Sequence, residues 1–219
     1  TGYVKVFKYS SNAWTELPNL GDPLDGDATD YYGNSVSLSS DGTILAVGAS
    51  RATIGGNANT GYVKVYQYYG TAWVILDARL YETAANSYFG NQVSLSSDGT
   101  ILAVGANKYL SNTGYVEVYQ YNGSSWSLLG ARLNGVANSS FGWSVSLSSD
   151  GTIMAVGAYR WNNNYTGYVE VYQYNGSSWS RLGPRLNGEA ANNSFGHKVS
   201  LSSDGTILAV GAMAADING

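Results

Sequence analysis

The chain has 219 residues, of which 44% are hydrophobic and only 12% are charged, and its formal net charge is −4. This length allows one large β domain or two small ones, and the low charge leaves Ser, Thr, Asn, Gly and Tyr to cover the surface. Eleven scattered Lys and Arg residues argue against a nucleic-acid-binding surface, the absence of Cys excludes disulfides and thiolate metal sites, and no apolar run is long enough for a membrane helix.

Four repeat units follow one another along the chain. They begin at Thr1, Thr60, Thr113 and Thr166, so the units are residues 1–59, 60–112, 113–165 and 166–219. Each unit contains, in order, a segment like GYVxVYxY, a short segment around a Trp, VSLS, and ILAVGA or IMAVGA. These segments are rich in β-branched and aromatic residues and are bounded by Gly, Asn, Ser or Asp, which predicts short β-strands.

Four short strands in a unit of about 53 residues are typical of a β-propeller blade. The strands are apolar on both sides, as blades require, because each blade packs between two neighbours. A β-solenoid is the alternative, but its coils usually have shorter periods and lack Asp-Gly hairpins. We therefore predict an all-β fold, a single β-propeller domain over residues 1–219 with four blades.

The phase of the repeat predicts how the two ends of the chain are used. If VSLS is the innermost strand, each blade is offset from its repeat unit by two strands, and residues 2–14 and 199–212 form only half-blades. Unpaired strand edges need a partner. The half-blades either pair within the chain and close a four-bladed ring, or pair head-to-tail between chains in a filament or larger ring. A third alternative is that the sequence is cut from a longer array.

The Asp-Gly step between VSLS and ILAVGA is predicted to be a turn. Its four copies offer one carboxylate each, at Asp41, Asp98, Asp150 and Asp204, whereas Ca²⁺ takes about six to eight oxygen ligands. Gly tolerates the positive φ of a tight hairpin turn, which makes Asp-Gly between apolar strands a strong hairpin signal.

The loop before Tyr32 is the candidate metal site. It carries Asp22, Asp25, Asp27 and Asp30, and close carboxylates repel one another unless a cation or water separates them. Calcium is therefore the one candidate cofactor, and a solvated polar loop is the alternative.

The order Phe-Gly, strand, Asp-Gly, strand, Gly-Ala recurs from Phe89, Phe141 and Phe195, with Tyr32 replacing Phe in the first copy. This pattern resembles the FG-GAP repeat, the blade unit of integrin α-chain propellers, and is similar to repeats in secreted proteins of marine bacteria and algae. The resemblance covers essentially the whole chain. It implies an extracellular or cell-surface protein used for adhesion or as a scaffold.

Aromatic residues in the variable loops that follow ILAVGA are candidate ligand-binding residues, because such rings stack on sugars or pack against a protein partner. Local packing within the loops is the alternative. These residues are Tyr109, Tyr159, Trp161 and Tyr165. Five Asn-X-Ser/Thr motifs in predicted loops are candidate glycosylation sites, at Asn122, Asn138, Asn164, Asn175 and Asn192.

The sequence contains no recognisable catalytic constellation. Its single histidine, His197, occupies a position that varies between repeats, and catalytic triads and His-based metal sites need partners that it lacks. Lys5 and Lys64 exchange with Glu117 and Glu170 at one repeat position. This predicts a solvated face, and the alternative is that opposite charges on neighbouring blades help to set their register. We expect a non-enzymatic adhesion, scaffold or filament protein with self-association or a matrix partner, and a carbohydrate-binding, calcium-dependent lectin-like module is the alternative.

Overall fold

The computed structural model describes residues 2–18 and 29–213. Apart from one short α-helical segment, α1 (Tyr109–Asn112), and one π-helical turn, η1 (Trp161–Tyr165), its elements are β-strands. The predicted all-β class is therefore confirmed. All pairings within the sheets are antiparallel.

Three sheets have five strands each, four in a meander and a two-residue strand that pairs with the third. The first consists of β3 (Tyr32–Leu38), β4 (Ile44–Ala49), β5 (Tyr62–Tyr68), β6 (Trp73–Ile75) and β7 (Leu80–Tyr81). The second consists of β8 (Phe89–Leu95), β9 (Ile101–Ala106), β10 (Tyr115–Tyr121), β11 (Trp126–Leu128) and β12 (Leu133–Asn134). The third consists of β13 (Ser144–Leu147), β14 (Ile153–Ala158), β15 (Tyr168–Tyr174), β16 (Trp179–Arg181) and β17 (Leu186–Asn187).

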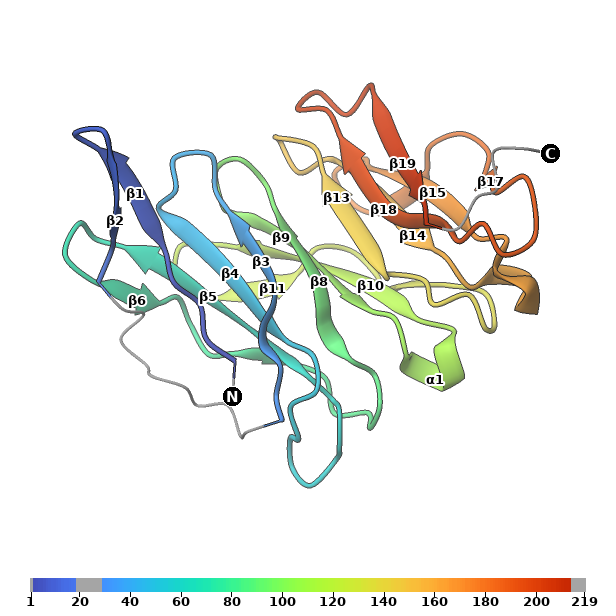
Figure 1. The fold of residues 1–219 in the computed structure, drawn as a ribbon, viewed down its shortest axis with the longest axis horizontal. Coiled ribbons are helices and arrows are strands. Elements are labelled where there is room, and N and C mark those ends of the chain that lie inside the picture. Colours follow the sequence, from blue (N-terminus) through green and yellow to red (C-terminus); the bar gives the residue numbers. More distant parts are fainter. Residues whose placement is uncertain (1, 19–28, 214–219) are drawn as a thin grey trace.

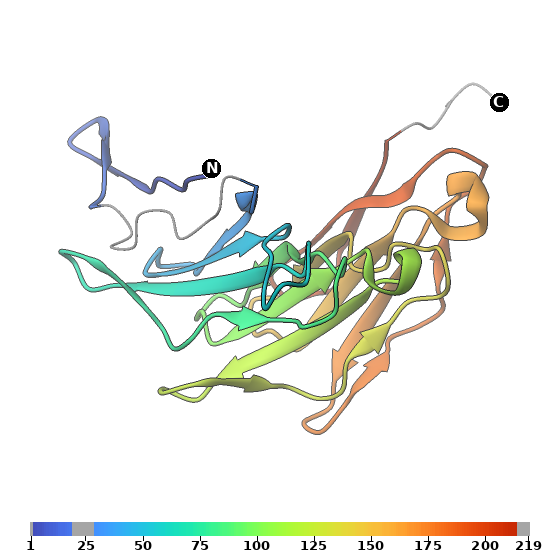
Figure 2. The same cartoon turned by 90° about the horizontal axis from the view of Figure 1, so that it is seen from below.

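A two-stranded sheet lies at each end of the row of sheets (Figures 1 and 2). One is the hairpin of β1 (Phe7–Ser10) and β2 (Ala13–Glu16), and the other is the hairpin of β18 (Phe195–Leu201) and β19 (Leu208–Ala212). Among the described residues these two hairpins do not pair with each other, so the chain does not close into a ring in this structure. Pairing between chains stays a prediction.

The hydrophobic core is divided into layers between neighbouring sheets. Val63 and Val65 of the first sheet cluster with Phe89, Val93 and Val104 of the second, and a second cluster joins the second and third sheets in the same way. Side chains on both faces of each central sheet are therefore buried, which explains the apolar residues on both sides of these strands.

Glycine is required where two sheets approach most closely. A Cβ atom on Gly48, Gly105 or Gly157, the Gly of the first three ILAVGA or IMAVGA segments, would lie 2.0–2.1 Å from the carbonyl oxygen of the Phe-Gly glycine in the next sheet. The repeated Gly-Ala and Phe-Gly pairs thus form one contact between blades.

Identical residues differ in burial according to their neighbours. Val36 in β3 is 51% exposed, whereas its counterpart Val93 in β8 is 2% exposed. At the other end of the row Ile207 is 70% exposed and its counterpart Ile44 is 9% exposed, because the turn around Gly99 of the next sheet covers Ile44.

The predicted solvated face around the exchanging Lys and Glu residues holds for Lys5, which is exposed, and is wrong for the other three copies. Lys64, Glu117 and Glu170 are all buried. Glu117 accepts hydrogen bonds from Arg132 Nε (2.8 Å) and the Tyr119 hydroxyl (2.6 Å), and Glu170 is paired in the same way with Arg185 and Tyr172. Packing between blades buries this position, so each carboxylate needs a cation and a hydroxyl beside it.

Candidate functional site

The Asp-Gly end of the molecule is a set of four equivalent turns. In the first, Asp41 Oδ1 accepts hydrogen bonds from Ser39 Oγ (2.7 Å) and the Thr43 backbone N–H (2.9 Å). The same bonds recur at Asp98, Asp150 and Asp204. They lower the pKa of each carboxyl group, at Asp204 to about 2. The predicted turn is confirmed, and each Asp carboxylate accepts hydrogen bonds from Ser and Thr residues of its own turn.

Hydrogen bonds also join these turns to one another. The backbone N–H of Ser40 donates to the carbonyl of Ser97, Ser97 donates to Ser149, and Ser149 donates to Ser203, each over 2.8 Å. In addition, Ser37 Oγ accepts from the backbone N–H of Leu95 in the next sheet (3.0 Å). The Ser residues of VSLSS thus hold neighbouring blades together, and the same contacts between blades are repeated along this end of the molecule.

Three of the four candidate metal ligands, Asp22, Asp25 and Asp27, lie outside the described residues. Asp30 is described and is 6% exposed. In the part of the chain that the structure describes, no three acidic, His or Cys side chains are grouped so that they could hold a metal ion. Calcium at this loop therefore stays a prediction.

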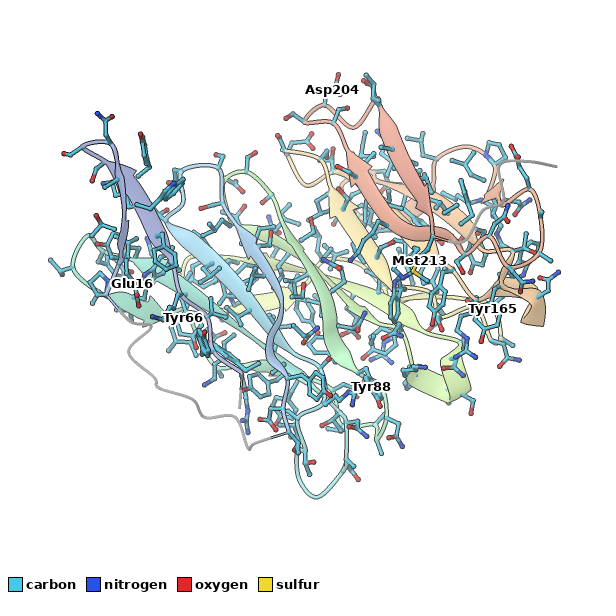
Figure 3. The ribbon with its side chains drawn as sticks, viewed as in Figure 1. Glu16, Tyr66, Tyr88, Tyr165, Asp204 and Met213 are labelled. Carbon is cyan, nitrogen blue, oxygen red and sulfur yellow. The ribbon has the colours of Figure 1, made fainter. Side chains whose placement is uncertain are left out.

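The opposite end of the molecule carries the residues that do not repeat. Figure 3 shows Tyr88 and Tyr165 at this end, far from Asp204 at the Asp-Gly end. Two sets of loops meet here, those that precede Phe-Gly and those that follow Gly-Ala. We refer to this surface, formed by residues 29–31, 50–52, 84–88, 107–112, 139–143, 159–165 and 194–197, as the loop end.

Three basic residues occupy one equivalent position on the loop end. The backbone N–H of Arg51 donates to the Asp30 carbonyl (3.1 Å), that of Lys108 to the Ser87 carbonyl (3.3 Å), and that of Arg160 to the Ser139 carbonyl (3.1 Å). One backbone bond, repeated in three successive blades, therefore places the three cations on the same end of the molecule.

The side chains of these cations contact aromatic rings and amides. The Arg51 guanidinium lies 4.1 Å from the centroid of the Tyr31 ring and 5.7 Å from that of Tyr88. Arg160 donates to Asn112 Oδ1 (3.4 Å) and lies 5.2 Å from the Tyr165 ring. Burial, together with the charges of Arg160 and Arg51, lowers the pKa of Lys108. Lys108 is thus close enough to Arg51 and to Arg160 to be repelled by each of them.

A cavity of about 480 Å³ opens on the loop end between the segments 84–88 and 108–112. Its wall includes Lys108, Tyr88, Asn86 and Asn112. The segment 109–112, which contains α1, has positive φ at Leu110 and Ser111 and is not a regular helix. The cavity is large enough for a small ligand and presents both a cation and amide groups to it.

A cluster of four rings lies beside the cations. Trp143 packs against Tyr159 (ring centroids 4.6 Å apart) and His197 (5.4 Å), and Tyr159 packs against Tyr165 (6.1 Å) and His197 (5.7 Å). Burial and the charge of Lys198 lower the pKa of His197. The structure thus brings together Tyr159 and Tyr165, two of the predicted ligand-binding residues.

The other two predicted aromatic residues lie apart from this cluster and pack within their own blades. Tyr109 contacts the ring of Tyr115 edge-on, with centroids 5.0 Å apart. Trp161 contacts Tyr168 in the same manner over 5.8 Å. For both residues local packing explains the contacts, although Tyr109 also borders the cavity.

Sequence reasoning missed Trp143 and the three cations. Their positions in the repeat could have identified them from the sequence. Trp143 and His197 occupy the position of Asn34 and Asn91 directly after Phe-Gly, and the cations come two residues after Gly-Ala.

Buried side chains on the loop end that lack a protein hydrogen-bond partner include those of Asn107, Ser140 and Trp143. Asn107, which precedes Lys108, is 1% exposed, and neither its amide oxygen nor its amide nitrogen is bonded. The indole N–H of Trp143 is also unbonded.

The five Asn-X-Ser/Thr asparagines are all exposed, which leaves them accessible to a modifying enzyme. At Asn122 the side-chain oxygen accepts hydrogen bonds from Ser124 and Ser125 within a tight turn, so this residue also has a structural use. Glycosylation stays a prediction at each of them.

The meanders of four antiparallel strands, packed face to face in a row, are β-propeller blades. Solved structures agree at the level of fold. The chain is similar to the hydrazine synthase of Kuenenia stuttgartiensis (18% identity, TM-score 0.55, covering 81% of this chain and 49% of that one). It is also similar to a candidate 6-phosphogluconolactonase of Bacteroides uniformis (10% identity, TM-score 0.54, 80% and 46%). The chain spans about half the length of these proteins.

The sequence matches the FG-GAP repeat family over residues 14–66 and 133–172. The chain is therefore an FG-GAP-like β-propeller protein, and the expected resemblance is confirmed. No curated protein matches the sequence. Within the described residues there is no helix of the length and apolar character that crossing a membrane requires.

Proposed function

We propose that the chain is a non-enzymatic, extracellular adhesion module in which repeated blades form a rigid frame and the loop end recognises the partner. The observation that carries this proposal is the contrast between the two ends of the molecule. The Asp-Gly end uses its polar groups to join blades. The loop end instead gathers three cations from one repeat position, together with four rings and a cavity from loops whose sequences differ between repeats. Function in repeat proteins commonly lies in such variable loops on a fixed scaffold.

A binding role is favoured over catalysis by the surroundings of His197. Its ring neighbours are Trp143 and Tyr159, and its pKa is lowered by burial and Lys198. Among the described residues no carboxylate hydrogen-bonds to it, and a general base of the triad type needs such a partner. The extracellular location rests on the FG-GAP resemblance.

The test is binding of the purified protein to immobilised matrix or cell-surface material. The variant Tyr165→Ala changes the loop end, and Gln120→Ala, at an exposed position on the outer part of a blade, is the matched control. We expect Tyr165→Ala to weaken binding several-fold and Gln120→Ala to leave it unchanged. Equal binding by all three proteins would refute recognition by the loop end.

A second candidate function, a filament or scaffold subunit, is favoured by the two half-blades. Val36 and Leu38 at one end and Ile207 and Met213 at the other are exposed apolar side chains. A groove of about 420 Å³ lies between residues 4–7 and the β3–β4 hairpin. We propose that the amino-terminal hairpin of one chain completes the carboxy-terminal half-blade of the next.

The complete blades give the register of this pairing. Ala46 pairs with Val65 in the first sheet, so the equivalent residues, Ala209 and Val6, pair between chains. Because the chain has no Cys, the variant Val6→Cys/Ala209→Cys reports this contact directly. We expect a ladder of disulfide-linked oligomers under oxidising conditions, whereas Lys5→Cys/Ala209→Cys, shifted by one residue to the other face, gives none. Absence of any disulfide in the first variant would exclude strand exchange.

A further inference from the structure

The three cations of the loop end differ from the three arginines that pair with buried glutamates. Arg132, Arg181 and Arg185 each form an ion pair with a buried glutamate, over 3.1 Å for Arg181 and 2.8 Å for Arg185. Within the described parts of the chain, Arg51, Lys108 and Arg160 form no ion pair. No carboxylate of the described residues therefore neutralises the charges of these three side chains.

The geometry brings these cations together instead of separating them. Arg160 contacts Asn112, and Asn112 shares the wall of the cavity with Lys108. Arg51 lies over Tyr88, which is part of the same wall. Since Lys108 is repelled by both arginines, an anion bound beside Lys108 in the cavity relieves this repulsion and is attracted by all three charges.

The ring cluster continues from the cations without a break. Arg160 lies over Tyr165, Tyr165 packs on Tyr159, and Tyr159 packs on Trp143. Flat aromatic faces beside hydrogen-bonding groups are suited to sugar rings, which present apolar faces and hydroxyl edges. The amides of Asn86 and Asn112 in the cavity wall are donors and acceptors for such hydroxyls.

We propose that the loop end binds an acidic saccharide, with its carboxylate or sulfate group held by Arg51, Lys108 and Arg160 and its ring against the aromatic cluster. This proposal rests on the proposed function and names the class of its ligand. A long phosphate polymer is a poorer fit, because the net charge of −4 repels it beyond the three cations.

The experiment measures binding of three oligosaccharides by calorimetry and by tryptophan fluorescence. One carries uronic acids, one carries sulfates, and one is the neutral parent of the same length. The variants are Lys108→Gln and Arg51→Gln/Arg160→Gln, with Lys8→Gln on the exposed strand β1 as the charge-matched control, and the thermal midpoint of each variant reports its folding.

We expect an acidic oligosaccharide to bind, the neutral parent to bind at least tenfold more weakly, and Lys108→Gln to lower affinity about tenfold, as loss of one charge-assisted bond predicts. Lys8→Gln should match the original chain, and affinity should fall as salt rises. The preferred acid, uronate or sulfate, identifies the anionic group.

Several results would overturn the proposal, and they show whether the proposed function fails with it. Equal binding of neutral and acidic oligosaccharides, or no effect of the cation variants, would exclude an anionic ligand while leaving recognition by the loop end intact. If matrix binding depends on Tyr165 but excess acidic oligosaccharide does not compete with it, the function stands and the ligand class is wrong. If Tyr165→Ala has no effect on matrix binding, both proposals fail.

Discussion

The contact between Gly105 and the next blade gives a direct test of how the blades pack. A Cβ atom on Gly105 would lie 2.1 Å from the carbonyl oxygen of Gly142, whereas a Cβ atom on Gly211, at the same repeat position, has no neighbour nearer than 3.7 Å. The replacement Gly105→Ala must therefore push two backbones apart, and Gly211→Ala needs no movement.

Overpacking of this kind costs about 1–3 kcal/mol. In a chain of this size each kcal/mol lowers the midpoint of thermal unfolding by about 2–4 °C. We expect Gly105→Ala to lower the midpoint by about 2–12 °C and Gly211→Ala to change it by less than about 1 °C. The assay is thermal unfolding followed by circular dichroism, on dilute protein so that self-association does not contribute.

Equal effects of the two replacements would refute the packing described here. A neutral Gly105→Ala would show that the sheets are not held at this distance. If chains assemble by strand exchange, Gly211 gains the neighbour that it lacks in the single chain. Gly211→Ala should then weaken assembly, measured by light scattering, without changing the stability of the single chain.

Three further predictions concern charge. The folded-state pKa of the turn carboxyls is depressed, so they stabilise the fold above the unfolded-state pKa of about 3.9. That contribution is lost as pH falls toward 2. In the variant Asp98→Asn/Asp150→Asn, the midpoint of thermal unfolding should therefore fall less steeply between pH 5 and pH 2 than in the original chain. An equally steep fall would contradict the hydrogen bonds assigned to these turns. Arg132→Ala should lower the free energy of unfolding, measured in urea, by about 2–3 kcal/mol, because it leaves the buried Glu117 carboxylate without its cation. Arg181→Ala should lower it by less than about 1 kcal/mol, because Glu170 remains paired with Arg185. Equal losses for the two variants would contradict this account. If the acidic loop binds calcium, millimolar Ca²⁺ raises the unfolding midpoint and Asp25→Asn/Asp27→Asn abolishes the rise; a midpoint insensitive to Ca²⁺ would exclude the site.

The site was less predictable than the fold, for a physical reason. Tyr159 and Tyr165 could be selected because aromatic residues in loops stand out against a repeated background. The cations could not, because one Arg or Lys two residues after Gly-Ala is unremarkable until three blades are laid side by side. Their convergence depends on the spacing between blades, which no single repeat encodes.

The sequence by itself determined the strands, their order within a blade, and the turn at Asp-Gly. These depend on alternation, β-branched residues and a Gly with positive φ, which are local properties. Only the tertiary structure decided which copies are buried. Val36 and Val93 each begin the same fourteen-residue segment, VSLSSDGTILAVGA, yet Val36 is exposed and Val93 is buried. Burial at these positions comes from the neighbouring blade, and the two ends of this chain each lack one.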